Sequence, residues 1–344
     1  MDPADALERI AYLLDRSLAD ARKASAFHRA TEIVRETPAE ELQERAKKGT
    51  LTELKGIGDS TGSVISDALA GQVPKRLQEL EATTEIPLGE GAEMRRALKG
   101  DCHTHSTWSD GGASIETMAS TAIALGHEYM VLTDHSPRLT VAHGLTAERL
   151  REQLDEVRRL NDVFAPFRIL TGIEVDILAD GALDQEEDML AQLDVVVASV
   201  HSKLSMERSA MTERMVVAVA SPHVDILGHC TGRKVRGFGD AQTVVRPQAT
   251  FDPEIVFAAC ARFDTAVEIN CRPERQDPPD ELLEIALEWG CKISIDTDAH
   301  APGQLEWQNY GCDKAARHEI DPADVVNTWA AKDLVAWTGT HPSA

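Results

Sequence analysis

Hydrophobic residues in the first part of the chain follow the spacing of helices. Ala6, Ile10, Leu13 and Leu14 recur at intervals of three and four residues, which places them on one helix face. Similar patterns continue to about residue 85, and roughly four or five short helices fit into this region. We therefore predict a small all-helical domain over residues 1–85.

From residue 98 the pattern changes to short apolar, β-branched runs that alternate with helical stretches such as 148–160 and 279–290. The runs lie at 98–103, 129–133, 168–175, 194–200, 224–228, 266–270 and 292–296. Alternating strands and helices indicate a parallel sheet with right-handed crossovers. Seven strand–helix units are one short of the eight-fold barrel. We therefore predict an α/β fold, a distorted (β/α)7 barrel over 98–344. A linker at 86–97 joins it to the helical domain.

Glycines interrupt the helical domain in the segment LTELKGIGDSTGSVISDAL. Gly56, Ile57 and Gly58 lie between two helical stretches, and Thr61 and Gly62 begin the second of them. Glycines let backbone amides face outward at a helix N-terminus, where a phosphate can bind without side-chain charge. The pattern predicts either a DNA-backbone contact made by these five residues or a plain tight turn.

Composition narrows the function. Hydrophobic residues make up 42% of the chain and charged residues 27%, which is typical of a globular protein. The formal net charge of −23 argues against nucleic-acid binding by bulk electrostatics, so any DNA contact has to be local. The N-terminus MDPADALERI lacks the features of a signal peptide, and the cysteines form no CxxC pair. Both observations favour a cytoplasmic protein with reduced thiols.

Potential metal ligands follow almost every predicted strand. They are His103, His105, Asp110, His135, Glu174, His201, His229, Asp298 and His300. The C-terminal ends of parallel barrel strands meet on one face, so these side chains should converge. Mixed imidazole and carboxylate ligands suit zinc, manganese or iron better than calcium or magnesium. Since nine ligands are too many for one ion, we predict a site with roughly two or three divalent metal ions.

The motifs that carry these ligands resemble those of a known family. GDCHTHSTWSDG, VLTDHS, GIEVDI, ASVHS, DILGH and TDAH occur in the order found in the PHP (polymerase and histidinol phosphatase) family. The resemblance covers about residues 98–340 and implies the following ligand sets: His103, His105, Glu174 and Asp298 for a first metal, Glu174 with His201 and His229 for a second, and Asp110, His135 and His300 for a third. It also implies phosphoester hydrolysis by a metal-bound hydroxide held by Glu174 and Asp298.

Other segments narrow the resemblance further. PHVDILGHCTGRKV and AVEINCRPERQDPPDE resemble PHP domains attached to bacterial family X DNA polymerases, which act on DNA ends. KGIGDSTG, together with KASAFHRATEIV, resembles the N-terminal helix-hairpin-helix domain of those polymerases. Only the short segment 86–97 stands where a polymerase palm would follow, so polymerase activity is not expected. Cys230, Lys203 and Leu204 depart from residues common in those domains, which weakens the inference about substrate.

Polar residues beside the ligands are candidate substrate contacts. Arg233, Lys234 and Arg236 follow the fifth strand, Arg138 follows His135, and Asn270 ends the sixth strand. Solvated basic loops are the alternative for the four cations, and Asn270 either orients substrate or caps the barrel.

Three functions fit the sequence. The first is a multinuclear metal-dependent phosphoesterase acting on DNA ends, as a 3′-5′ exonuclease or 3′-end phosphatase in DNA repair. The second is a small-molecule phosphatase of the histidinol-phosphatase type, which the net acidity favours. The third is an inactive DNA-binding module, against which the complete ligand set argues. The predicted partner is accordingly DNA ends or a small phosphate ester.

Overall fold

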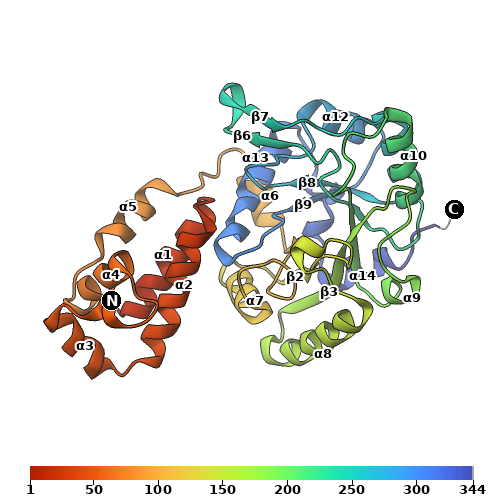
Figure 1. Ribbon diagram of the computed structural model, residues 1–344. Coiled ribbons are helices and arrows are strands. Elements are labelled where there is room, and N and C mark those ends of the chain that lie inside the picture. The colour runs from red at the N-terminus through yellow and green to blue at the C-terminus, as the bar shows by residue number, and fades with distance from the viewer. Residues whose placement is uncertain (343–344) are drawn as a thin grey trace. The chain divides into compact units, whose positions relative to one another are not determined.

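The computed structural model describes residues 1–342 of the chain. The chain divides into a helical unit, residues 1–86 together with 301–303, and an α/β unit made up of the other described residues. Figure 1 shows the helices of the first and the central sheet of the second.

The first unit contains the helices that the hydrophobic spacing predicts. They are α1 (Pro3–Arg16), α2 (Ala21–Glu36), α3 (Ala39–Lys48), α4 (Asp59–Leu69) and α5 (Lys75–Thr83). Helix α1 begins where the Asp2 carboxylate accepts a hydrogen bond from the Ala4 amide at 2.8 Å, which satisfies one of the free amides of the first turn. Its apolar face, with Leu7, Ile10 and Leu14, is buried against α2, α4 and α5.

The glycine-containing turn before α4 is specified by close packing. Gly56 has φ of +102°, and a Cβ atom there would lie 2.6 Å from Ile33 Cδ1. The Gly58 amide donates to Thr61 Oγ1 at 2.9 Å, and that hydroxyl donates back to the Gly58 carbonyl at 3.1 Å. Ile57 is buried in the helical core. Of the residues predicted to contact DNA, Ile57 and Thr61 thus use their side chains within the turn.

A histidine–carboxylate pair makes the stability of the helical unit depend on pH. The Asp15 carboxylate, 2.9 Å from His28 Nε2, raises the pKa of His28 above its ordinary value of 6.5. When folding raises the pKa of a histidine, the resulting stabilisation is complete at pH values below the unfolded-state pKa. This stabilisation is lost as the pH rises through the folded-state pKa. We expect Asp15→Asn to accelerate amide exchange in α1 and α2 severalfold at about pH 5.5 and little at about pH 9.

The measurement is hydrogen exchange of the full chain, with the variant and wild type compared at the same pH. Glu36→Gln, which changes an exposed carboxylate near the end of α2, is the matched control and should show no pH-dependent ratio. Equal acceleration by Asp15→Asn at both pH values would show that the pair does not stabilise this unit through the charge of His28.

The second unit is a nearly closed parallel barrel. Within the described residues its strands are β1 (Gly100–Thr104), β2 (Tyr129–Leu132), β3 (Arg168–Asp176), β4 (Val195–Ser199), β5 (Ile226–Leu227), β8 (Ala266–Asn270) and β9 (Ile293–Asp296). They lie in this order, and every neighbouring pair is parallel. Each strand falls on one of the predicted apolar runs, so the (β/α)7 prediction is confirmed.

Side-chain alternation places the barrel between two apolar layers. In β2, Met130 belongs to a cluster that contains Met118 of α7 (Ile115–Ala124) and Val157 of α8 (Ala147–Phe164). The next residue, Val131, belongs to a different cluster that reaches Leu334 of α14 (Ala331–Thr338). Successive strand residues face opposite sides of a sheet. Both faces of the sheet are therefore covered, as its nearly continuous apolar strands require.

Five further α-helices of this unit follow the strands. They are α9 (Glu187–Leu190), α10 (Arg208–Val219), α11 (Pro253–Phe263), α12 (Asp280–Glu288) and α13 (Gln308–Arg317). No helix in the described part of the chain is both long and apolar enough to cross a membrane. All six cysteines are buried, and none forms a disulfide, as predicted.

Carboxylates close the barrel between its first and last strands. The Cys102 amide donates to Asp296 Oδ1 at 2.8 Å, and the Thr297 hydroxyl donates to Asp101 Oδ2 at 2.5 Å. Beyond them, the His105 amide donates to the Ala299 carbonyl at 2.8 Å. These bonds hold β1 beside β9 where the regular ladder is missing, and they bring the segment of His103 and His105 next to that of Asp298 and His300.

Two segments differ from the sequence prediction. Residues 92–97, within the predicted linker, form helix α6 (Ala92–Ala97), because the Asp313 carboxylate accepts hydrogen bonds from the amides of Gly89 and Gly91 and Met94 is buried. After the fifth barrel strand, β6 (Lys234–Arg236) and β7 (Thr243–Arg246) form an antiparallel hairpin that projects from the barrel in Figure 1. Both elements are too short to produce a clear hydrophobic period.

Candidate metal centre

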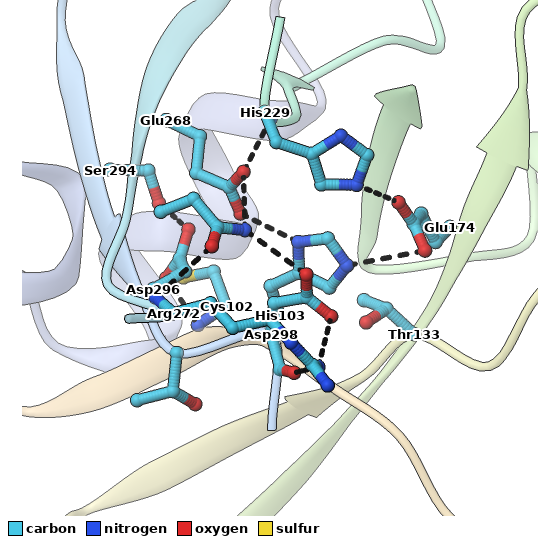
Figure 2. Close-up of polar contacts among 12 residues, drawn as sticks. Cys102, His103, Thr133, Glu174, His229, Glu268, Arg272, Ser294, Asp296 and Asp298 are labelled. Atoms are coloured by element: carbon cyan, nitrogen blue, oxygen red, sulfur yellow. Dashed lines mark hydrogen bonds and ion pairs between the residues drawn. The ribbon is translucent and has the colours of Figure 1, made fainter. Parts of the chain in front are cut away.

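The predicted ligands converge at the C-terminal ends of the barrel strands. His103 lies in β1, Glu174 lies in β3, and the other ligands lie in the loops that follow β1, β2, β4, β5 and β9. Figure 2 shows His103, Glu174, His229 and Asp298 facing one another. This convergence follows from the parallel topology, which sends every such strand end to one face.

Glu174 occupies the centre of the cluster and is buried. Its Oε1 lies 2.8 Å from His229 Nε2 and 3.1 Å from His201 Nε2. Its Oε2 lies 2.9 Å from His135 Nδ1 and 3.4 Å from His103 Nε2. Burial alone would raise the pKa of Glu174, but the surrounding histidines hold it well below its usual range. Each oxygen of this carboxylate thus faces a different set of imidazoles.

The donor atoms form three overlapping groups in which all ligand atoms lie within 4.8 Å of one another. The groups are His105, Asp110, His135 and His300; His103, His105 and Asp298; and His135, Glu174 and His201. His105 and His135 each belong to two groups, so the cluster is continuous. The assignment of particular residues to particular ions stays a prediction.

Several buried donor atoms in the cluster make no hydrogen bond within the described residues, although some of them lie within ion-pair distance of Glu174. They are Nε2 of His103, both ring nitrogens of His105 and His201, Nδ1 of His135 and His229, and Oε2 of Glu174. A buried polar atom without a hydrogen bond lowers the stability of the folded state by roughly 1–3 kcal/mol, so a cluster of such atoms indicates a binding site. Convergent imidazoles and carboxylates fit the coordination of divalent transition metals. The residues present can therefore hold metal ions.

Comparison with known proteins agrees with this donor set. Residues 101–232 match the family model described as PHP domain. The chain is 40% identical over 240 residues to the DNA polymerase/3′-5′ exonuclease PolX of Bacillus subtilis, a match that covers 70% of this chain and 41% of that relative. The chain therefore contains a PHP domain. Its match thus spans less than half of the length of that relative.

Other relatives are shorter than the Bacillus subtilis protein. The chain is 29% identical over 212 residues to a probable phosphatase of Thermoanaerobacter sp., covering 58% of this chain and 78% of the relative. The solved structure of a histidinol phosphate phosphatase from Lactococcus lactis, complexed with zinc, L-histidinol and phosphate, aligns with 64% of this chain and 93% of its own at 18% identity, with a TM-score of 0.45.

Glu268 orients the first histidine of the PHP cluster and was missed in the sequence. Its Oε1 lies 2.6 Å from His103 Nδ1, while its Oε2 accepts from the His229 amide at 2.5 Å (Figure 2). A carboxylate behind a ligating histidine fixes the ring and raises its basicity. Asn270 bridges onward, since its Nδ2 donates to Glu268 Oε2 at 3.1 Å and to Asp298 Oδ2 at 3.2 Å.

Two arginines that the sequence analysis did not select bind Asp298. Arg275 Nε donates to Asp298 Oδ2 at 3.0 Å, and Arg272 Nη1 donates to the Asp298 carbonyl at 2.8 Å. Burial alone would raise the pKa of Asp298, but these two cations hold it well below its usual range. Arg272 Nη1 also lies 2.9 Å from His300 Nδ1. Both arginines belong to the CRPER segment. This segment follows the one predicted strand that is not followed by a metal ligand, which was the only feature of the sequence that could have drawn attention to the two arginines.

The five predicted substrate contacts have different surroundings. Asn270 is buried beside Asp298, as described above. The Arg233 guanidinium donates to the carbonyls of Arg275 and Gln276, so it supports the loop that carries Arg275. Lys234 is half-buried, and burial followed by the charge of Arg275 lowers its pKa.

The other two cations are exposed. Arg138 Nε lies 3.5 Å from Asp184 Oδ1, and Arg236 lies in the hairpin. Substrate contact by any of the five stays a prediction.

Proposed function

We propose that this PHP-domain enzyme, a metal-dependent phosphoesterase, hydrolyses phosphate esters at DNA ends, as a 3′-5′ exonuclease or 3′-end phosphatase. The observation that carries the proposal is the convergence of Glu174 and eight further donor side chains, six of these nine residues having a buried donor atom that makes no hydrogen bond within the described part of the chain. The 40% identity to a relative named as a 3′-5′ exonuclease supports DNA as the substrate class.

Divalent ions held by these residues would supply Lewis-acid activation of the phosphoryl group. The protein's own residues place that charge. Arg275 and Asn270 hold the Asp298 carboxylate in one orientation, and Glu268 does the same for the His103 ring. Lys234 is half-buried, with its pKa lowered by burial and by the charge of Arg275, and is a candidate contact for a phosphoryl oxygen.

The turn before α4 supports DNA binding by the helical unit. Gly58 is exposed, and a Cβ placed there would meet no atom within 4 Å, so a sugar-phosphate backbone can approach the turn closely. The first amides of a helix have no intrahelical acceptor and carry a partial positive charge. The amides of Ile57, Gly58 and Gly62 already donate within the turn. We propose that Gly56 and Gly58, which are exposed and lack side chains, let a phosphate approach the N-terminus of α4 without a basic side chain.

Ser60→Glu tests this phosphate site. Ser60 is exposed in the first turn of α4, where a glutamate interacts favourably with the helix dipole and preserves the fold but repels a phosphate. We expect the ratio of kcat/KM for 3′-labelled DNA to that for p-nitrophenyl phosphate to fall severalfold. Ser66→Glu, exposed further along the same helix, is the matched control. Equal ratios in the two variants would contradict DNA binding at this turn.

Small-molecule phosphatase activity is the second candidate. The 29% identity to probable phosphatases, together with the net charge of −23, favours it. Turnover of 3′-labelled DNA, 3′-phosphate DNA and histidinol phosphate by one metal-loaded preparation separates the candidates. A higher kcat/KM for histidinol phosphate would make the second candidate correct. No turnover of any of them would leave only a non-catalytic role.

A further inference from the structure

A groove of about 700 Å³ leads away from the metal cluster at His201. Its walls come from the loop after β4, with Lys203 and Ser205, and from the segment that follows the β6–β7 hairpin, with Gln248 and Thr250. His201 Nε2 lies 3.1 Å from Glu174 Oε1, so the groove begins at the reacting end of the barrel. Its volume lies within the range of roughly 300–1,000 Å³ that is typical of ligand sites.

The groove is basic in an otherwise acidic protein. Lys203, Arg208 and Arg246 line it, against Glu207 as its acidic residue. Arg208 is neutralised by Asp252 at 2.9 Å, whereas Arg246 donates to the uncharged carbonyl of Gly232. No hydrogen bond or ion pair of the Lys203 ammonium occurs within the described residues. Two positive charges in the groove are therefore available to an anion.

The backbone at Lys203 is held in an unfavourable conformation. Its φ is +54°, in the left-handed region, which is unfavourable for a residue with a side chain and persists only where its surroundings enforce it. The buried Arg214 guanidinium enforces it by donating to the Ser202 carbonyl at 2.8 Å and to the Ile177 carbonyl at 3.1 Å. The Met206 amide donates to the Lys203 carbonyl at 3.1 Å. Lys203 is thus presented on a rigid loop, which lowers the entropic cost of binding.

We propose that Lys203, together with Arg246, binds a phosphodiester of the substrate strand adjacent to the scissile phosphate. This inference rests on the proposed function and makes it more specific. A single phosphate ester would occupy the metal cluster and leave the groove without a ligand. A polynucleotide would place a second phosphate against the two cations. Lys203 is accordingly a specificity-determining residue that favours strands over phosphate monoesters.

Lys203→Asn is the decisive variant, because asparagine tolerates the left-handed conformation and lacks the charge. Hydrogen bonds to charged groups contribute roughly 1.5–3 kcal/mol, so we expect KM for a single-stranded oligonucleotide to rise about tenfold or more. The ratio of kcat/KM for the strand to that for p-nitrophenyl phosphate should fall by the same factor. The slope of log KM against log salt should decrease by about 0.7, as expected for the loss of one contact to a single strand.

Two further variants test whether the effect is specific to the positive charge at position 203. Lys203→Arg keeps the charge and should keep the wild-type ratio. Lys332→Asn removes an exposed lysine of α14 that does not line the groove, and its ratio should equal that of wild type. A wild-type ratio in Lys203→Asn, or an equal loss in Lys203→Arg, would overturn the inference while leaving the proposed function intact. Wild-type protein that hydrolyses p-nitrophenyl phosphate but no strand would overturn both.

Discussion

Replacing Glu174 with glutamine should reduce kcat for every phosphate ester by roughly a thousandfold. The Glu174 carboxylate lies within 3.6 Å of ring nitrogens of His103, His105, His135, His201 and His229. Glutamine has nearly the same size, so the barrel should fold, but the central negative charge is lost. Loss of the carboxylate that lies between the histidines removes a charged metal ligand, and the loss of one preorganised charged group at a reacting centre costs roughly 10²–10³ in rate.

Two measurements check this prediction. Steady-state kinetics with p-nitrophenyl phosphate give the change in kcat, and elemental analysis gives the metal content, which should fall below that of wild type. His223→Ala is the control, because His223 lies outside the cluster, with its Nε2 3.6 Å from Glu187 Oε1, and should retain full activity. Wild-type turnover and metal content in Glu174→Gln would remove Glu174 from the centre of the site.

The barrel could be predicted because its strands depend on local pattern. Runs such as 129–133 and 194–200 are apolar and β-branched over the length of a strand, and polar residues bound them. Once the strands are parallel and consecutive, their C-terminal ends must meet, and so must the histidines that follow them. The strand topology alone is therefore sufficient to predict that His103 and Asp298 lie together, and no knowledge of side-chain packing is required.

The residues that support the ligands could not be predicted in the same way. Glu268 lies inside the run AVEIN, and its contact with His103 spans a sequence separation of 165 residues. Arg275 reaches Asp298 only because the Thr231 amide and hydroxyl donate to the Asp277 carboxylate and tie the loop after β8 to the segment after β5. These contacts depend on the course of a loop, for which apolar periodicity carries no signal.

Supplying manganese or zinc to metal-stripped protein should raise the melting temperature of the barrel by roughly 10 °C. Without a cation, the unpaired donors of His103, His105, His201 and Glu174 remain buried at a cost of roughly 1–3 kcal/mol each. A ligand that binds only the folded state at about 1,000 times its Kd contributes about 4 kcal/mol. For a domain of this size, each kcal/mol corresponds to roughly 2–4 °C.

Calorimetry of chelated and reconstituted full-length protein measures the shift, and hydrogen exchange locates it. Amide exchange should slow in β1, which carries His103, in β3, which carries Glu174, and in β9, which leads into Asp298. The amides of α1 and α2 should exchange at the same rate with and without metal. The same ions should stabilise Glu174→Gln much less than wild type, since that variant lacks the central carboxylate. A shift of equal size in both proteins, or equal protection of α1 and β1, would mean that the ions stabilise the chain through some other site.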